Sequence, residues 1–345
     1  MAATWTPSAR LKRVAVERAQ PLSATLELTY KCNWRCVFCY NPRHHGPRGL
    51  SGEEWLGVLD ELRALGTLYL ALTGGEPLTH PEFPMIARGA RERAFALRIL
   101  TNGALITEKA ADEIAELLPM AAEMSLHGSR AETHDRATAT PGSFDALFRG
   151  LDRLAERGVP VVLKTPLTRL NEDEVEPMSA LAEARGVPWR LDPVLTPRDD
   201  GDAGPLAYRA SPEAVEGIYR RLAAVGQLPH EERSTGGLNC GLGRTTLVVD
   251  PEGNVYPCMQ WRKAPLGNVR ETPLADLWPT SERRLQVAKT ARSANDRMVA
   301  SGEALASFPF CPALAAQHTG DPLAPDEGHA ERARIVEGLR SGRPA

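Results

Sequence analysis

The sequence predicts an α/β fold, namely a partial, TIM-like (β/α)6 barrel followed by a small C-terminal extension. Between residues 24 and 226, short apolar runs alternate six times with longer amphipathic segments. Six such units in a row favour a parallel sheet with right-handed crossovers. Because a closed TIM barrel needs eight units, six predict a barrel that is open on one side. Three cysteines and a candidate hairpin beyond residue 230 indicate the extension.

The apolar runs define six candidate strands, at 24–30, 68–72, 97–101, 122–126, 161–166 and 189–195. Helices are expected between them, because capping residues precede the amphipathic segments. These N-cap candidates are Ser51, Thr107, Ser143 and Ser211. Pro212 fits the first position of a helix, and Gly158 fits the end of a helix over 144–157.

Composition indicates an ordinary globular protein. The chain has 345 residues, of which 42% are hydrophobic and 25% charged, with a net charge of −3. This charge balance gives no reason to expect nucleic-acid or anionic-membrane binding. Neither a membrane-spanning run nor a signal peptide is recognisable in the sequence. We expect a cytoplasmic protein, because the spacing of the six cysteines fits metal ligation better than a disulfide framework, and metal-binding cysteines must be reduced.

Three cysteines, Cys32, Cys36 and Cys39, lie within eight residues directly after the first candidate strand. A four-iron cluster takes four ligands, so a Cys-x3-Cys-x2-Cys run leaves one iron open to another molecule. The alternative is a structural zinc site in which His44 or His45 completes a Cys3His tetrahedron.

This run resembles the signature of the radical S-adenosylmethionine (radical SAM) superfamily, including the aromatic Phe38 before the third cysteine. In that family the open iron is chelated by the amino and carboxylate groups of SAM. The reduced cluster then cleaves SAM to a 5′-deoxyadenosyl radical, which abstracts hydrogen from the substrate. The resemblance implies two cofactors, a SAM-binding 4Fe-4S cluster and SAM, and a flavodoxin or ferredoxin-type electron donor.

A second motif, Gly74-Gly75-Glu76-Pro77, follows the second candidate strand. Glycines let the backbone approach a ligand closely, although a glycine-rich turn alone is weak evidence. In radical SAM relatives the corresponding strip binds the amino group of SAM. The resemblance therefore implies that these four residues contact SAM.

Polar residues also end the next four candidate strands, at Asn102, Ser125, Lys164 and Asp192. By resemblance, such groups contact the ribose, carboxylate or adenine of SAM. Without the resemblance, Asn102 would be an ordinary turn residue and Ser125 a strand-end hydroxyl. Some relatives carry an arginine where this chain has Thr138, so the partner of the SAM carboxylate is not identified.

The remaining cysteines are Cys240, Cys258 and Cys311. Cys258 follows a candidate hairpin over 247–256 with its turn at 250–254, and a helix is predicted over 274–288. This pattern resembles the SPASM and twitch extensions, which bind auxiliary four-iron clusters. A full SPASM domain has at least seven cysteines, so these three imply one auxiliary 4Fe-4S cluster with three cysteine ligands and an open or unusually ligated iron.

Several roles are compatible with this auxiliary site. The cluster could bind substrate, relay electrons or hold the extension together, and structural zinc or inert cysteines are the alternatives. Residues 319–326 resemble the tail of peptide- and tetrapyrrole-modifying relatives, but their terminal cysteine is absent. We expect an N-terminal segment at 1–23, the barrel at 24–230, the extension at 231–326 and a tail at 327–345.

The resemblance implies a radical SAM enzyme that oxidatively crosslinks a ribosomally made precursor peptide. The alternatives are an enzyme of haem or tetrapyrrole modification, a small-molecule dehydrogenase, or a non-enzymatic metal-binding scaffold. The Gly74–Pro77 strip argues against a scaffold, since a scaffold needs no SAM site. Residues 1–23 are too few for a winged-helix leader-binding domain, so a separate protein or the barrel surface would recognise a leader. No catalytic residue is assigned from the sequence.

Overall fold

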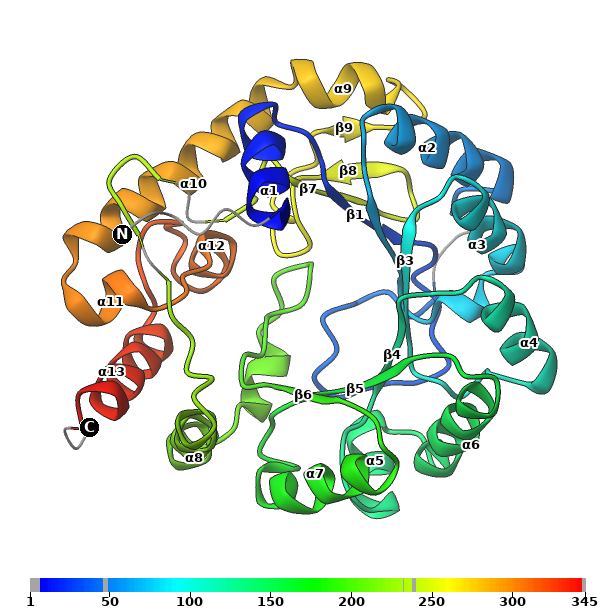
Figure 1. Cartoon of the computed structure of the whole chain (residues 1–345), viewed down its shortest axis with the longest axis horizontal. Coiled ribbons are helices and arrows are strands. Elements are labelled where there is room, and N and C mark those ends of the chain that lie inside the picture. Colours follow the sequence, from blue (N-terminus) through cyan, green and yellow to red (C-terminus); the bar gives the residue numbers. More distant parts are fainter. Residues whose placement is uncertain (1–6, 46–48, 232, 238–239, 343–345) are drawn as a thin grey trace.

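A parallel sheet forms the framework of the protein in the computed structural model, which describes residues 7–45, 49–231, 233–237 and 240–342. Six parallel strands pair in the order of the sequence, as Figure 1 shows. They are β1 (Ser23–Glu27), β2 (Tyr69–Thr73), β3 (Ala96–Thr101), β4 (Ala121–Ser125), β5 (Val161–Pro166) and β6 (Trp189–Asp192). The predicted partial barrel of six β/α units is confirmed.

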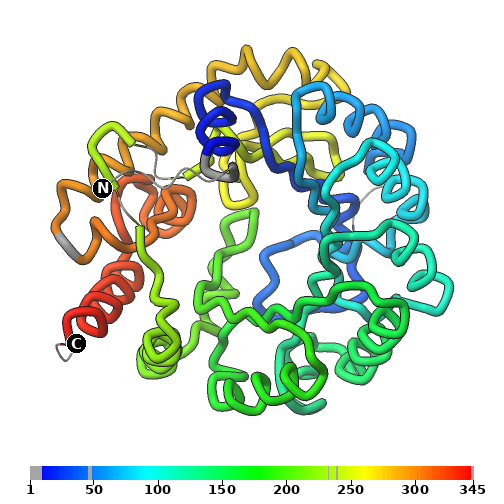
Figure 2. Tube along the Cα trace, in the orientation of Figure 1, coloured from blue at the N-terminus to red at the C-terminus, as the bar shows by residue number. Residues whose placement is uncertain are grey.

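Helices cover the outer face of this curved sheet (Figures 1 and 2). They are α2 (Gly52–Ala64), α3 (Phe83–Glu92), α4 (Glu108–Glu116), α5 (Ala131–Thr138), α6 (Ser143–Glu156) and α7 (Val175–Ala184), with α1 (Pro7–Glu17) before the first strand. Ser51 caps α2 in a capping box with Glu54, and Thr107 caps α4 by accepting a hydrogen bond from Ala110 N.

The main apolar core lies between the sheet and these helices. Leu26, Leu72 and Ile99 are fully buried strand residues in this core. Trp55, Leu59 and Leu62 recur on one face of α2 at helical spacing and are equally buried. Burying apolar side chains on both elements is what fixes each helix against the sheet.

The extension begins as a continuation of the barrel sheet. Strand β7 (Thr246–Val249) pairs in parallel with β1, and the strands β8 (Asn254–Tyr256) and β9 (Gly267–Asn268) follow in antiparallel order. The predicted hairpin is confirmed, with Asp250 accepting hydrogen bonds from Glu252 N and Asn254 N in its turn. Its attachment to β1 makes one nine-stranded sheet and was not predicted.

The other helices are α8 (Pro212–Ala224), α9 (Leu274–Thr280), α10 (Glu282–Ala300), α11 (Glu303–Ser307), α12 (Pro312–Thr319) and α13 (Glu327–Ser341). A second apolar core, built on Tyr219, Phe308 and Val336, joins α8 to α13. The N-cap Ser211 and the following Pro212 are confirmed at the start of α8.

Two helix boundaries differ from the prediction. The single helix expected over 274–288 is wrong, because the chain forms α9 and α10 with a break at Ser281. Pro279 lies in the last turn of α9, and Ser281 then caps α10. Ser143 is the first residue of α6 and not its cap, because Gly142 occupies the cap position with a φ of 77°.

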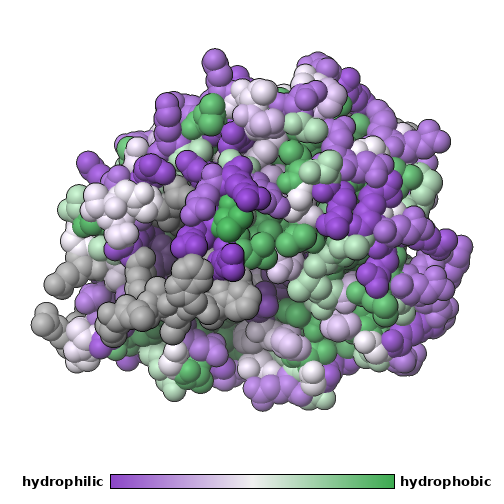
Figure 3. All heavy atoms as spheres, turned by 45° about the horizontal axis from the view of Figure 1, so that its top comes forward, coloured by the Kyte–Doolittle hydropathy of each residue, from purple (hydrophilic) through white to green (hydrophobic). Residues whose placement is uncertain are grey.

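The surface drawn in Figure 3 is a mosaic of hydrophilic and hydrophobic residues. Among the described residues, no helix combines the length and the apolar character needed to cross a membrane.

Candidate functional site

The first cysteine trio lies on a loop that leaves the carboxyl end of β1. Backbone hydrogen bonds from Arg35 N to Thr138 O (2.9 Å) and from Val37 N to Ala137 O (3.0 Å) hold this loop against the end of α5. Burial raises the pKa of Cys36, and the neighbouring charges of Cys39 and Cys32 raise it further. The three cysteines lie within eight residues of one loop, in which Cys39 N donates to Cys36 O at 3.0 Å, so they occupy one small region of the structure.

The glycine strip after β2 packs directly on the chain that leads into Cys32. Gly75 N donates to Thr29 O (2.7 Å), and Glu76 N donates to Lys31 O (2.8 Å). A Cβ atom at Gly74 would lie 2.3 Å from the carbonyl oxygen of Thr29, and Gly74 has a φ of 142°. Glycine is required here because any side chain would collide with backbone.

A Cβ atom at Gly75 would meet the same segment, at 2.3 Å from Lys31 O and 2.5 Å from Tyr30 O. Pro77 then opens a short 3-10 helix, η1 (Pro77–Thr79), and Thr79 Oγ1 donates to Lys31 O at 3.3 Å. The glycine-rich strip and the cysteine loop thus form one connected unit.

Glu76 connects the end of β2 to the end of β3. Its fully buried carboxylate accepts hydrogen bonds from Thr101 Oγ1 (2.8 Å), Asn102 N (2.7 Å) and Leu78 N (3.1 Å). Burial raises the pKa of Glu76 to about 7, and these hydrogen bonds partly offset that effect.

Asn102 reaches from the end of β3 to the cysteine loop. Its Nδ2 donates to Asn33 Oδ1 at 2.7 Å and lies 3.9 Å from Cys32 Sγ. The ends of β1, β2 and β3 therefore converge around Cys32, as expected for chemistry placed at the carboxyl ends of barrel strands.

Phe38 is part of the cysteine loop, and its side chain packs into an aromatic cluster. Its ring contacts His127 edge-on, with centroids 5.1 Å apart, and Trp34 packs similarly against His134 at 5.3 Å. Burial lowers the pKa of both histidines, so both rings are neutral at physiological pH. The sequence prediction did not include His127 among the residues near the cysteine loop. Its position two residues after the strand-end Ser125 was a signal that could have identified it.

The remaining candidates for SAM contacts lie further along the sheet. Ser125 ends β4 opposite Lys164 of β5. Lys164 Nζ is 3.0 Å from Glu123 Oε2, and Arg98 Nη1 is 2.8 Å from the other oxygen of this carboxylate. Asp192 ends β6, where its Oδ1 accepts a hydrogen bond from Val194 N at 2.9 Å.

The second cysteine trio, Cys240, Cys258 and Cys311, belongs to the extension. Burial raises the pKa of Cys258 to about 12, and the charges of Cys311 and Cys240 contribute to this rise. Cys258 also packs against an apolar cluster that contains Leu242 and Val287. Cys311 lies directly before α12, and it lines a cavity of 220 Å³ together with the predicted Asp192.

The donor set of both trios suits iron–sulfur chemistry, since thiolates are the usual ligands of such clusters. Among the residues that the structure describes, no three histidine, cysteine or acidic side chains are grouped to hold a single metal ion. His45, a candidate in the zinc alternative, has its Nε2 2.9 Å from Arg35 Nη2.

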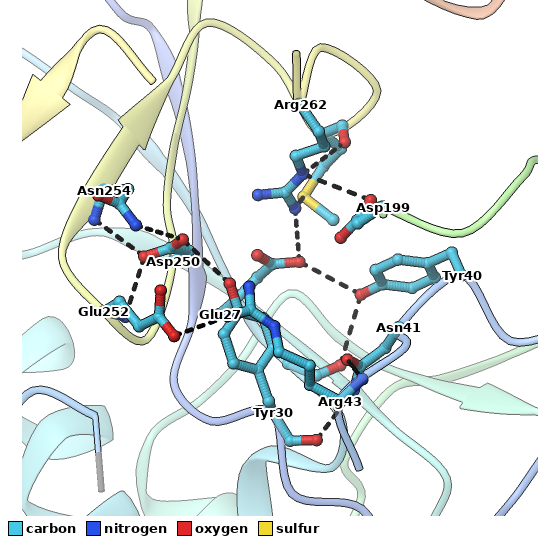
Figure 4. A network of polar contacts seen from close by, with 12 residues as sticks. Glu27, Tyr30, Tyr40, Asn41, Arg43, Asp199, Asp250, Glu252, Asn254 and Arg262 are labelled. Atoms are coloured by element: carbon cyan, nitrogen blue, oxygen red, sulfur yellow. Dashed lines mark hydrogen bonds and ion pairs between the residues drawn. The ribbon is translucent and has the colours of Figure 1, made fainter. Parts of the chain in front are cut away.

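A buried polar network joins the two cysteine regions (Figure 4). Arg262 Nη2 lies 2.7 Å from Glu27 Oε1, and Tyr40 donates to the same oxygen at 3.3 Å. Tyr40 is the residue after Cys39, whereas Arg262 follows Cys258 by four residues. One carboxylate at the end of β1 therefore holds both loops.

A second branch of the network anchors the hairpin turn. Tyr30 donates to Asp250 Oδ2 at 3.0 Å, and Asn41 Nδ2 donates to Tyr30 O at 2.8 Å (Figure 4). The guanidinium of Arg43 lies 4.1 Å from the centre of the Tyr30 ring and 2.7 Å from Glu252 Oε1. The chain on both sides of the first trio is thus fixed to the extension.

Asp199 brings the segment after β6 into the network. Its backbone N donates to Tyr40 O at 2.9 Å, and its Oδ1 lies 3.8 Å from Arg262 Nε. Burial raises the pKa of Asp199 to about 6, which Arg262 partly offsets. Asp199 and Arg262 also line a cavity of 350 Å³ with Lys263 and Gln317.

Comparison with known families accords with this geometry. Residues 26–182 match the model of the radical SAM superfamily, and residues 240–299 match the model of the SPASM iron-sulfur cluster-binding domain. Together the two models cover more than half of the chain. The protein belongs to the radical SAM superfamily and carries a SPASM-type iron–sulfur extension.

Curated proteins that are similar to this chain include a maturase, a peptide cyclase and a heme synthase. The mycofactocin maturase MftC of Mycolicibacterium smegmatis is 31% identical over 69% of this chain, which spans 64% of that protein's length. The PqqA peptide cyclase of Rhizobium meliloti is 29% identical over 75% of this chain and 73% of its own length. An AdoMet-dependent heme synthase of Methanosarcina barkeri is 27% identical over 74% of this chain and 81% of its own length.

Solved structures show the same fold at low sequence identity. Streptococcus suis SuiB bound to the precursor peptide SuiA has a TM-score of 0.64 and 14% identity, covering 83% of this chain and 73% of SuiB. Native anSMEcpe with bound AdoMet has a TM-score of 0.71 and 15% identity, covering 93% of this chain and 98% of its own.

Proposed function

We propose that this protein reductively cleaves SAM and uses the resulting hydrogen abstraction to crosslink a ribosomally made precursor peptide. The observation that carries the proposal is the convergence of the cysteine loop, the glycine strip and Asn102 on one point, with the second cysteine trio tied to the same loop through Glu27 and Arg262.

In this proposal Cys32, Cys36 and Cys39 hold the SAM-binding 4Fe-4S cluster, and Cys240, Cys258 and Cys311 hold the auxiliary cluster. When bound and reduced, the first cluster together with SAM supplies hydrogen-atom abstraction. The protein's own residues position the loop that would hold this cluster. Asn102 and the backbone of the glycine strip orient the chain around Cys32, and Glu76 fixes the ends of β2 and β3 to each other.

The proposed contacts to SAM come from the residues that surround this loop. They are Phe38, Gly74, Gly75, Glu76, Pro77, Asn102, Ser125, Lys164 and Asp192. Because both carboxylate oxygens of Glu76 already accept hydrogen bonds from the protein, we assign the contact to the amino group of SAM to the backbone of the strip.

The proposed substrate site is a groove along the segment that follows β6. The cavity of 350 Å³ beside Arg262 adjoins a second cavity of 520 Å³ that is lined by Leu206 and Arg209. Pro197, Gly201 and Gln317 line both cavities. Two adjoining cavities with apolar and charged walls suit a peptide chain better than a flat macrocycle.

The names of relatives support the peptide as substrate, since MftC is a maturase, PqqA is a cyclised peptide and SuiB was solved with its precursor peptide. Tetrapyrrole modification is the second candidate function, because a heme synthase and an Fe-coproporphyrin III synthase of Methanosarcina barkeri are also relatives. A flavodoxin or ferredoxin-type donor and a separate leader-binding protein complete the proposed set of partners.

The test is a mass measurement on the product of a short open reading frame beside the gene. Anaerobic incubation of this peptide with the enzyme, SAM and dithionite should remove two hydrogen atoms for each crosslink formed. The variant in which Cys32, Cys36 and Cys39 are alanine should leave the peptide unchanged. Conversion of an iron coproporphyrin, with the peptide unaltered, would replace this proposal by the tetrapyrrole function.

A further inference from the structure

The cavity of 220 Å³ beside Cys311 is lined by His329, a buried histidine whose hydrogen bonding is incomplete in the part of the chain that the structure describes. The cavity lies between the segment after β6, the residues before α12, and α13. Its polar lining includes Asp192, Cys311, His318, Asp326 and His329. An inference about this cavity rests on the proposed auxiliary cluster, because Cys311 is one of its three proposed ligands.

His329 lies in the first turn of α13, where the backbone holds it firmly. Asp326 caps this helix, with its Oδ1 accepting a hydrogen bond from His329 N at 2.9 Å. The imidazole packs edge-on against two aromatic rings, with centroid distances of 5.2 Å to Phe308 and 5.1 Å to Phe310. Phe310 directly precedes Cys311, so the histidine ring lies against the segment that carries this thiol.

The Nε2 atom of His329 is buried and, in the part of the chain that the structure describes, has no hydrogen-bond partner. The residue as a whole is only 6% exposed. Leaving such a polar atom unsatisfied costs about 1–3 kcal/mol, so a native protein usually provides it with a partner. A bound metal centre would be such a partner.

Three other polar residues of the cavity, Asp192, His318 and Asp326, have protein partners. His318 Nδ1 lies 2.8 Å from Asp326 Oδ2, and His318 Nε2 lies 3.3 Å from Arg209 Nη2. Both oxygens of Asp326 are therefore engaged, one by each of the two histidines. Asp192 accepts a hydrogen bond from Val194 N.

We propose that Nε2 of His329 is the fourth protein ligand of the auxiliary cluster held by Cys240, Cys258 and Cys311. Imidazole replaces thiolate on iron in some natural clusters and raises their reduction potential. A four-iron cluster carries one ligand on each iron, so its ligand atoms stand apart instead of crowding around one ion. His329 thereby completes a four-ligand set that the cysteines alone leave open.

The test uses full-length protein in which Cys32, Cys36 and Cys39 are alanine, so that only the auxiliary cluster remains. After reduction, pulsed electron paramagnetic resonance should detect a nitrogen hyperfine coupling that changes when histidine is labelled with 15N. The coupling should be lost in His329→Ala. In His329→Cys it should also be lost, while the iron content is retained and the reduction potential falls. His318→Ala, which alters the same cavity, is the matched control and should keep the coupling.

Two results would overturn the assignment, namely an iron-loaded protein without histidine coupling, or a coupling that survives in His329→Ala and His329→Cys. An iron-free protein would instead show that the auxiliary cluster itself is absent, which is a failure of the proposed function. The His329→Cys variant guards against misfolding, because retained iron shows that the site still forms. No substrate is needed for any of these measurements.

Discussion

The carboxylate of Glu27 and the guanidinium of Arg262 lie 2.7 Å apart, with side chains that are only 1% and 7% exposed. The pair joins the end of β1 to the segment that follows Cys258, across 235 positions of sequence. Tyr40 binds the same carboxylate oxygen, so the loop of the first cysteine trio depends on the same contact (Figure 4). We interpret this pair as the main polar link between the two cysteine regions.

Replacing Arg262 by methionine should destabilise the protein strongly. The substitution leaves Glu27 buried without its cation, and breaking a buried pair in this way costs about 3–5 kcal/mol. Urea denaturation of the anaerobic protein, followed by circular dichroism, measures the change.

The matched control for this variant is Arg270→Met. Arg270 also joins the extension to the barrel, through Glu54 at 2.6 Å, but both side chains are exposed. Its loss should cost at most about 1 kcal/mol. Equal losses in the two variants would contradict the importance assigned to the buried pair.

Replacing Gly75 by alanine should abolish SAM binding and lower stability. The new Cβ atom would lie 2.3 Å from Lys31 O and 2.5 Å from Tyr30 O, so the strip and the cysteine loop must move apart. Equilibrium dialysis with SAM measures the first effect, and thermal unfolding measures the second.

Gly217→Ala is the control for this variant, since its Cβ atom would meet nothing within 4 Å in α8. It should retain SAM binding and gain about 0.5–1 kcal/mol. Normal SAM binding by Gly75→Ala would rule out the close contact as a requirement.

Glu76 should make stability fall with rising pH. Its pKa is raised by burial from an ordinary value of 4.5 to about 7. Between these values the unfolded chain loses the proton that the folded chain keeps, so raising the pH favours unfolding, and the effect levels off above pH 7. Between pH 6 and 8 the wild type should lose about 1 kcal/mol more than Glu76→Gln. Denaturation curves at several pH values measure this difference, and parallel pH profiles of the two proteins would contradict a raised pKa.

Replacing Cys258 by alanine should separate the two clusters by role. Iron content should fall by about four atoms, because one of the proposed cluster sites is lost. Reductive cleavage of SAM to 5′-deoxyadenosine should continue, whereas peptide crosslinking should stop. Chromatography of the nucleoside and mass spectrometry of the peptide measure the two outcomes. Normal crosslinking by this variant would reduce the second cluster to a structural role.

The barrel was predictable because its signals are local. Strand periodicity and helix caps such as Ser51 can be recognised from a few neighbouring residues. Cys32 and Gly74 closely follow candidate strands, which placed them at strand ends. The join of β7 to β1 was not predictable, because backbone hydrogen bonds between distant strands leave no residue signature. The break at Ser281 was missed although Pro279 and the cap residue Ser281 are local sequence signals for it.

The site was predictable only in part, for the same physical reason. The resemblance supplied the cysteines and the strip, but the pairing of Glu27 with Arg262 depends on how β1 meets the extension. His329 was missed because a single histidine on a polar helix forms no distinctive sequence pattern. Only the folded structure shows that it is buried and lines a cavity beside Cys311.

The most direct test of the two-cluster radical SAM assignment is to count iron and assay SAM cleavage in the same anaerobic preparations. The wild type should hold about eight irons and release 5′-deoxyadenosine when reduced in the presence of SAM. The Cys32, Cys36 and Cys39 alanine variant should hold about four irons and release none. A colourless, zinc-loaded wild type, or 5′-deoxyadenosine formation that survives loss of the first trio, would contradict the assignment.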